Sequence, residues 1–348
     1  MSSELPSDRE TARKIAATIG DLDAASDEAL LRAGMDAALA AVAAELRANT
    51  PAGALAGVWS EVLRHGVAAA VRLAGPADWT WFVSGSVARG EAAPGSDVET
   101  MVALGDAVDD DAKTALLSRA ADVHALLERC GILGDANGVL ASRPRFCRRT
   151  SSWSDGIRRW TADPREDRGV VMAGLMADST GVSGGLAEDV LRAQTVAAAR
   201  PSYPIRQAML QDATSMRASI PSRLRMFATQ SDTVDLKLAA VDPVVKIARW
   251  AAVSVGSDAL STCARLDAAT AKVLDPDDVS SLRDCFEWLL RFRWRVRAAA
   301  FLEGRRTSDV VSLSELAPQE RAALRNVAHE VAGISRKLNY LASTSAFR

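Results

Sequence analysis

Residues 79–104 differ in composition from the Ala- and Leu-rich segments on either side of them. Trp79–Ser84 is aromatic and β-branched, which predicts a buried strand. Asp97–Leu104 alternates in polarity and predicts a second strand, joined to the first by the loop Gly85–Gly95. With the helical segments around them, the two strands predict a small α/β unit.

Helices are predicted on both sides of these strands. The segments 26–47, 55–73 and 109–129 have strong helix propensity, and each is followed by a Gly or a Pro. Residues 132–141 predict a third strand, and from Ser142 the chain is predicted to be helical apart from loops at 178–185 and 200–204. Late helices are expected at 279–301 and 318–341. Apolar residues recur along the last one at steps of three and four: Leu324, Val327, Val331, Ile334, Leu338 and Leu341.

This order of elements predicts an α+β fold. A polar segment and a helix occupy residues 1–50, an α/β domain is expected over 51–150, and an all-α domain over 151–348. A chain of 348 residues suits about two domains that each bury a core. The apolar seam of the last helix would serve a dimer as well as the chain's own core, so the oligomeric state stays open.

The composition argues against several classes of protein. The 42 basic and 44 acidic residues nearly balance, whereas a general nucleic-acid binder carries a basic excess. No apolar run reaches the roughly 18 residues of a membrane span, and the polar N-terminus is unlike a signal peptide. Four scattered cysteines indicate reduced thiols. We therefore expect a soluble cytoplasmic protein that binds neither nucleic acid nor membranes.

The loop between the two predicted strands carries residues suited to phosphate chemistry. Gly85 lets the backbone approach a ligand closely, and exposed N–H groups with the Ser86 hydroxyl can hold a phosphate. Asp97 and Glu99 lie two apart on a strand, so both carboxylates point to one face and repel each other unless a cation lies between them. Mg²⁺ prefers such ligands. The combination indicates phosphoryl or nucleotidyl transfer. An ordinary turn followed by a strand with a solvated face would give the same residue pattern.

Three short motifs carry a resemblance to a known family. Gly85-Ser86, Arg89-Gly90-Glu91 and Ser96-Asp97-Val98-Glu99 together resemble the signature of the DNA polymerase β-like nucleotidyltransferase superfamily. The chain is similar to the signal-transduction nucleotidyltransferases that neighbour the PII uridylyltransferases. Later segments support this similarity, which extends from about Leu55 to Leu341: 138–146, 234–237 and 286–293.

The resemblance implies transfer of AMP or UMP from an NTP to an acceptor, with release of pyrophosphate and with Mg²⁺ or Mn²⁺ as cofactor. Asp97 and Glu99 would bind the metal, although Glu99 stands where the family usually has Asp. Asp135 is the one candidate for a third, catalytic carboxylate. The residues assigned to nucleotide binding are Gly85, Ser86, Arg89, Ser96 and Lys237.

The acceptor and the activity itself allow alternatives. A regulatory protein is the first expectation for the acceptor, and a small molecule such as an aminoglycoside is the second. A non-catalytic nucleotide-binding regulator is the rival outside enzymes, and a helical scaffold with an inactive motif is the third possibility.

Several charged residues have simpler interpretations. Lys237 would contact phosphate or form a surface ion pair, and Arg143 and Arg145 would contact phosphate or lie in a solvated loop. Four arginines spread around the predicted helix 279–301, and one lies four residues after Glu287, which predicts a salt-bridged outer face. These four are Arg291, Arg293, Arg295 and Arg297. The histidines are expected to be structural.

Overall fold

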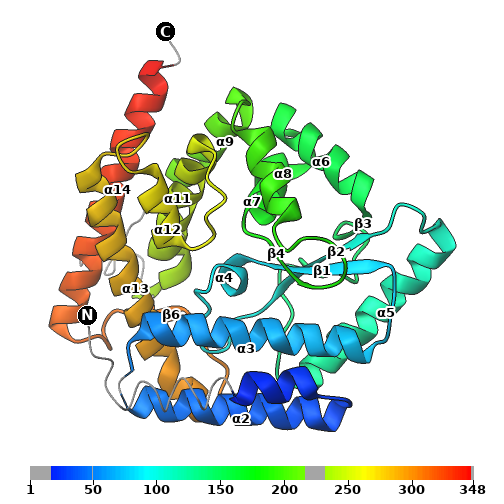
Figure 1. Cartoon of the computed structure of the whole chain (residues 1–348). Coiled ribbons are helices and arrows are strands. Elements are labelled where there is room, and N and C mark those ends of the chain that lie inside the picture. The colour runs from blue at the N-terminus through cyan, green and yellow to red at the C-terminus, as the bar shows by residue number, and fades with distance from the viewer. Residues whose placement is uncertain (1–16, 49, 216–231, 346–348) are drawn as a thin grey trace, which may run out of the picture. The chain divides into compact units, whose positions relative to one another are not determined.

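The computed structural model describes residues 17–48, 50–215 and 232–345, and it has an α+β fold (Figure 1). The described residues form two compact units. The first runs up to Gly156 and also takes in Asp178–Arg192, and the second comprises Ile157–Ala177 and the chain from Ala193 onward. The division falls within two helices, α6 (Thr150–Ala162) and α8 (Val190–Ala199).

The first unit contains a mixed four-stranded sheet in the order β3-β2-β1-β4. Its second strand in this order, β2 (Glu99–Leu104), pairs antiparallel with β1 (Trp79–Ser84) and parallel with β3 (Cys147–Arg149). β4 (Thr180–Ser183) pairs antiparallel with the other edge of β1. All six residues of β1 are buried, which confirms the prediction of a buried strand.

Helices cover this sheet. α3 (Ala52–Leu73) packs against α2 (Glu28–Arg47), and Figure 1 shows the two lying side by side. α3 also contacts β1, β4, α5 (Asp110–Arg129) and the short α4 (Gly85–Ala88). Side-chain caps begin α2 and α5, since an aspartate oxygen before each helix accepts a hydrogen bond from a backbone N–H of the first turn. The three helices predicted for this region are confirmed to within a few residues.

The predicted third strand, residues 132–141, is wrong. This segment runs beside β2 and bonds to it at two places, where Val98 N donates to Leu133 O and Thr100 N donates to Val139 O. Between these bonds the chain makes a turn that Asp135 closes, so no continuous ladder forms. The strand that does pair with this edge is β3, in a region predicted to be helical.

Two further corrections concern predicted loops. The loop 85–95 begins with the helical turn α4, and the loop 178–185 contains the edge strand β4. Gly184 directly follows β4, and a side chain does not fit there, because its φ is +124° and a Cβ would lie 2.5 Å from the Thr80 Cα. Thr80 Oγ1 accepts hydrogen bonds from the next two backbone N–H groups and fixes the end of this strand.

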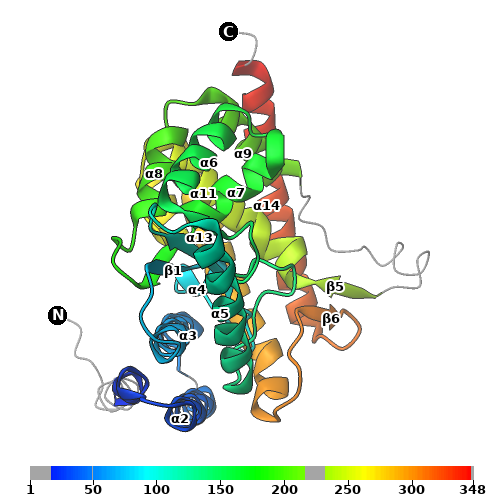
Figure 2. The same ribbon diagram turned by 90° about the vertical axis from the view of Figure 1, so that its right-hand side faces the viewer.

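The second unit is mainly helical. Its helices include α7 (Gly169–Ala177), after the short η1 (Glu166–Arg168), together with α9 (Tyr203–Ser215), α11 (Asp242–Val255), α12 (Thr262–Ala269), α13 (Pro276–Leu302) and α14 (Pro318–Ser345). A π-helical turn, η2 (Lys237–Val241), precedes α11. Figure 2 shows β5 (Thr233–Asp235) beside β6 (Val310–Ser312), an antiparallel pair that the prediction of an all-helical region missed.

The predicted apolar seam of α14 is largely buried within the second unit. Leu324 and Val331 are fully buried, and Ile334 and Leu338 nearly so. α14 contacts α9, α11, α13 and η2, so the seam packs against the chain's own helices. Leu341, near its end, is 51% exposed.

The arginines of α13 do not all lie on an outer face. Arg291 is exposed and 4.0 Å from Glu287, as the spacing predicts. Arg293 and Arg297 are buried and form ion pairs with Asp309, Arg293 through two bonds of 2.8 and 2.9 Å. The half-buried Asp309 carboxylate thus balances two arginine charges that the sequence pattern predicted to lie in solvent.

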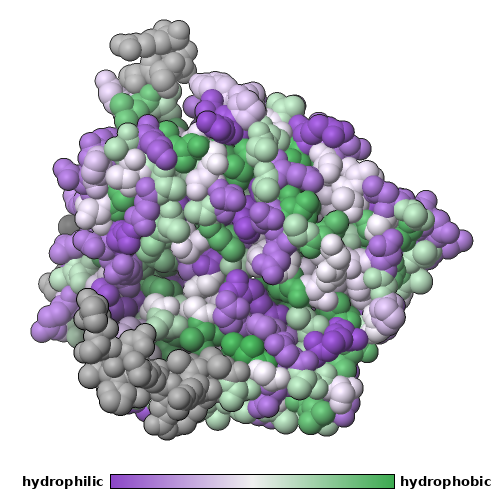
Figure 3. Space-filling view, viewed as in Figure 1, coloured by the Kyte–Doolittle hydropathy of each residue, from purple (hydrophilic) through white to green (hydrophobic). Residues whose placement is uncertain are grey.

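The surface mixes polar and apolar residues. Figure 3 shows the two kinds interspersed over the face that it draws, in keeping with the nearly equal numbers of acids and bases. None of the helices in the described part of the chain combines the length and apolar character needed to cross a membrane. None of the four cysteines, all of which are described, forms a disulfide.

Candidate active site

The end of β1 meets the start of β2 at the predicted phosphate loop. Ser84 and Glu99 are register partners, so Gly85 lies directly beyond this pair. Gly85 has a φ of +64°, and a Cβ added to it would lie 2.5 Å from Glu99 Oε2. Residue 85 must therefore be glycine for two reasons: its backbone is left-handed, and the Glu99 carboxylate occupies the space of a Cβ.

Ser86 and Ser96 have different surroundings. Ser86 is half-buried in α4, and its hydroxyl makes no hydrogen bond to another described residue. Ser96 is buried, and its Oγ accepts a hydrogen bond from Ala93 N at 2.9 Å, while its own N–H donates to Ala93 O. Ser86 thus keeps an open hydroxyl, whereas Ser96 closes the turn that leads into β2.

Arg89 holds the loop through buried charges. Its Nε lies 2.7 Å from Glu91 Oε2, and its Nη1 pairs with Asp178 from the segment before β4. All three side chains are at most 9% exposed. Burial alone would lower the pKa of Arg89, but the carboxylates of Asp178 and Glu91, with a further contribution from Glu99, outweigh it and raise the pKa. Arg89 therefore stays charged.

Asp178 is a residue of this site that the sequence reasoning missed. It follows an apolar helix and precedes a short strand, and its partner lies 89 positions earlier in the chain. No local motif connects the two residues. A single acidic residue in an otherwise apolar stretch was the one available signal.

Asp97 and Glu99 share the more open side of their segment. Both are half-buried, whereas Val98 between them and Thr100 after them are buried. Asp97 Oδ2 accepts a hydrogen bond of 3.4 Å from Ala136 N, so the turn after Asp135 adjoins it. The two carboxylates predicted to bind metal therefore share the open side of this segment, and Glu99 lies next to the Gly85 backbone.

Asp135 is bonded within its own turn. It is buried, its Oδ2 accepts from Val139 N at 2.8 Å, and its Oδ1 accepts from Asn137 Nδ2 at 3.2 Å. Its backbone N–H donates to Val98 O and ties the turn to the strand that carries the carboxylates. Both carboxylate oxygens of Asp135 are thus used to hold the turn in shape.

The donor set suits a metal that takes its other ligands from substrate. Within the described ranges, no three His, Cys, Asp or Glu side chains come together as a cage. Mg²⁺ is commonly held by one or two carboxylates plus substrate phosphates and water, and Asp97 with Glu99 fits that pattern.

The strand behind these carboxylates is fixed from its other face. Thr100 Oγ1 lies 3.1 Å from His124 Nε2 and accepts a hydrogen bond from Ala141 N. Burial lowers the pKa of His124 to about 4, so the imidazole is neutral at pH 7. His124 is structural, as expected.

Lys237 belongs to the second unit and begins the π-helical turn η2. It contributes, with the buried arginines of α13, to lowering the pKa of Asp309 against the opposing effect of burial. Its ammonium group forms no ion pair with a described residue. Lys237 and the two buried arginines therefore all act on the same carboxylate, that of Asp309.

Two family models match the chain. The model described as "Putative nucleotidyltransferase DUF294" matches residues 36–167, which include the loop 85–99 and Asp135. The model described as "Putative nucleotidyltransferase substrate binding domain" matches residues 204–341, which include Lys237. No curated protein matches the chain.

Proposed function

Because the chain belongs to the nucleotidyltransferase family that these two domain models describe, we propose that it moves AMP or UMP from an NTP to an acceptor hydroxyl. One observation carries the proposal: the Glu99 carboxylate packs over the Cβ-less Gly85, and Asp97, two residues before Glu99, is also on the open side of the chain. A triphosphate against the Gly85 backbone would therefore lie beside two carboxylates.

Asp97 and Glu99 would hold Mg²⁺ or Mn²⁺. When bound, such an ion neutralises phosphate charge and favours attack at the α-phosphorus. The acceptor oxygen then forms a bond to the α-phosphorus, the bond from that phosphorus to the bridging oxygen breaks, and pyrophosphate leaves with the electron pair. The acceptor proton passes to solvent or to a base.

Other residues of the loop would bind or position. The open Ser86 hydroxyl donates to a phosphate oxygen, and Arg89 keeps the loop in place through its two buried carboxylates. Asp135 shapes the turn beside Asp97, because both of its oxygens are already bonded there. This assignment differs from a general-base role. Lys237 is proposed as a phosphate contact because an ammonium group pairs readily with phosphate oxygens.

The acceptor is proposed to be a regulatory protein, which rests on the family resemblance alone. Nucleotide binding without transfer is the alternative outcome of the experiment below.

Thermal unfolding with ATP, UTP, GTP and CTP, each with and without Mg²⁺, tests the site. A nucleotide at about 100 times its Kd should stabilise the fold by about 2.7 kcal/mol, which raises Tm by a few degrees. Asp97→Asn and Glu99→Gln should abolish the Mg²⁺-dependent rise, whereas Asp122→Asn, an exposed acid on α5, should keep it.

Pyrophosphate release then separates an enzyme from a binding protein. Release that depends on an added acceptor and on Asp97 would support transfer. A Tm rise for one nucleotide without pyrophosphate release under any acceptor screened would favour the regulator. Equal Tm rises in Asp97→Asn and Asp122→Asn would contradict the proposed site.

A further inference from the structure

A cavity of ≈ 600 Å³ lies within the second unit, among α9, α11, α14 and the turn between α12 and α13. Its volume falls in the range of pockets that bind small organic molecules. The lining residues are Tyr203, Arg206, Gln207, Leu210, Trp250, Ser254, Val273, Leu338, Leu341 and Ala342.

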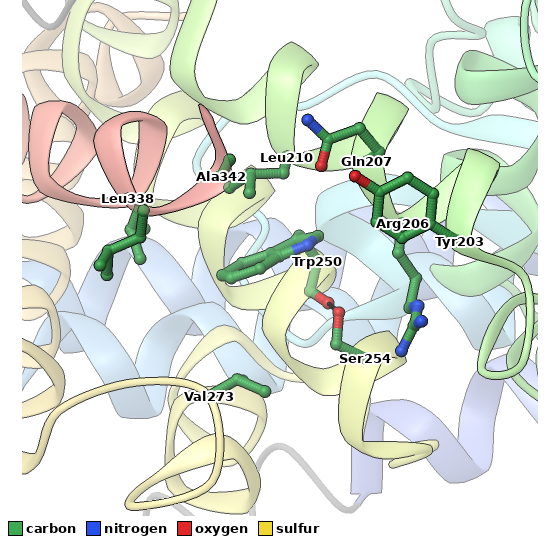
Figure 4. Close-up of a pocket in the computed structure, with 10 residues that line it drawn as sticks. Tyr203, Arg206, Gln207, Leu210, Trp250, Ser254, Val273, Leu338 and Ala342 are labelled. Atoms are coloured by element: carbon green, nitrogen blue, oxygen red, sulfur yellow. Dashed lines mark hydrogen bonds between the residues drawn. The ribbon is translucent and has the colours of Figure 1, made fainter. Parts of the chain in front are cut away.

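The cavity has an aromatic centre. Figure 4 shows Trp250 of α11 in the middle, with Tyr203 and Gln207 of α9 on one side and Leu338 and Ala342 of α14 on the other. Trp250 is half-buried, and Tyr203 at the rim is 53% exposed. Two aromatic side chains and apolar walls favour a flat, apolar ligand body.

Among the described residues that line the cavity, Arg206 is the charged one. No aspartate or glutamate lines the cavity, and the half-buried Arg206 guanidinium has no hydrogen-bond or ion-pair partner among the described residues. Buried arginines elsewhere in the chain have partners: Arg293 pairs with a carboxylate, and Arg265 donates to backbone carbonyls. An unpaired guanidinium at an apolar pocket favours an anionic ligand group and disfavours a cation.

We propose that this cavity binds a small aromatic molecule that carries one acid group, with its ring against Trp250 and Tyr203 and its acid on Arg206. The inference does not depend on nucleotidyl transfer, because the cavity and all its lining residues lie within the second unit. A polycationic molecule such as an aminoglycoside does not suit this cavity, since its described lining carries Arg206 and no carboxylate.

Titration with 8-anilinonaphthalene-1-sulfonate, a fluorescent aromatic anion, tests the proposal without NTP. We expect one saturable site. Arg206→Gln should weaken binding about tenfold or more, since a charge-assisted hydrogen bond is lost. The matched control Arg291→Gln, an exposed arginine of α13, should bind like the unchanged protein.

Two further measurements identify the ligand class. The neutral dye N-phenyl-1-naphthylamine should bind unchanged protein and Arg206→Gln equally, because only the acid contacts Arg206. Val273→Trp, which adds an indole at a 37% exposed position of the rim, should block both dyes without altering the core. 1-Naphthoate should displace the bound anion at lower concentration than decanoate.

Three results would overturn the proposal. If Arg206→Gln and Arg291→Gln bind the anionic dye with equal affinity, Arg206 is not the anion-binding residue. If Val273→Trp binds the dyes as the unchanged protein does, the dyes bind outside this cavity. More effective displacement by decanoate would remove the aromatic specificity. Far-UV circular dichroism of each variant checks that the fold is retained.

Discussion

Replacement of Gly85 by alanine tests the arrangement on which the proposed function depends. The added Cβ would lie 2.5 Å from Glu99 Oε2 and 2.9 Å from its Cδ, closer than non-bonded carbon atoms come. The Glu99 side chain is flexible and must swing away. The Glu99 carboxylate is therefore displaced from its place over residue 85, whereas the backbone of the fold is expected to stay unchanged.

Gly90→Ala is the matched control in the same loop. Gly90 also has a positive φ, +73°, but an added Cβ would meet no atom within 4 Å. Each substitution places alanine in the left-handed region, at a cost of about 1–2 kcal/mol. A smaller gain of about 0.4–1 kcal/mol comes from the less flexible unfolded chain. Both variants should thus lose about 1 kcal/mol of unfolding free energy, whereas only Gly85→Ala displaces Glu99.

Urea unfolding and Mg²⁺-dependent nucleotide binding measure the two effects separately. The free energies of unfolding should agree to within about 1 kcal/mol. Gly85→Ala should lose nucleotide affinity by tenfold or more, about 1.4 kcal/mol, and Gly90→Ala should keep it. If the two variants bind nucleotide equally, the contact between Gly85 and Glu99 does not organise the site, and the central argument for the proposed function fails.

Three other predictions concern titratable side chains that are largely buried, and they can be checked by urea unfolding. Asp178→Asn should cost about 3 kcal/mol, because Arg89 stays buried with one carboxylate fewer, whereas Glu28→Gln in an exposed ion pair should cost much less. The pKa of His124 is about 4 in the folded protein and 6.5 in the unfolded chain, so the unfolded state takes up a proton first as the pH falls. Between about pH 7.5 and about pH 5 the free energy of unfolding should therefore fall by about 2 kcal/mol. His124→Gln should remove that loss. Asp309→Asn should cost about 3–5 kcal/mol, because two buried arginines of α13 lose their carboxylate, and a loss below about 1 kcal/mol would contradict the ion-pair assignment.

Elements whose signal is local were predictable from the sequence. β1 is buried on both faces, so its aromatic and β-branched composition identifies it without knowledge of its partners. α2, α3 and α5 follow from propensity and from the residues that end them. The loop 85–99 was equally predictable in outline, because the glycine, serine and carboxylates that define it lie within 15 consecutive positions.

Elements that exist through distant pairing were not predictable. β4 contains Gly181 and is a strand because it pairs with Phe82 and Val83, about a hundred positions earlier. The segment 132–141 has strand-like residues but bonds to β2 at separated points, because the carboxylate of Asp135 competes for the backbone between them. In both cases the local composition indicated the opposite of what the tertiary contacts select.

The same reasoning explains why the candidate site needs a residue from outside its motif. Arg89 is buried within the loop, and a buried guanidinium is costly unless carboxylates surround it. Glu91, two residues later, supplies one, and Asp178 supplies the second only because β4 returns the chain to the edge of β1. The edge strand and the buried charge therefore depend on each other. A chain that kept all the loop residues but lost the segment 178–183 would leave the buried Arg89 guanidinium with Glu91 as its one strong ion-pair partner in the loop.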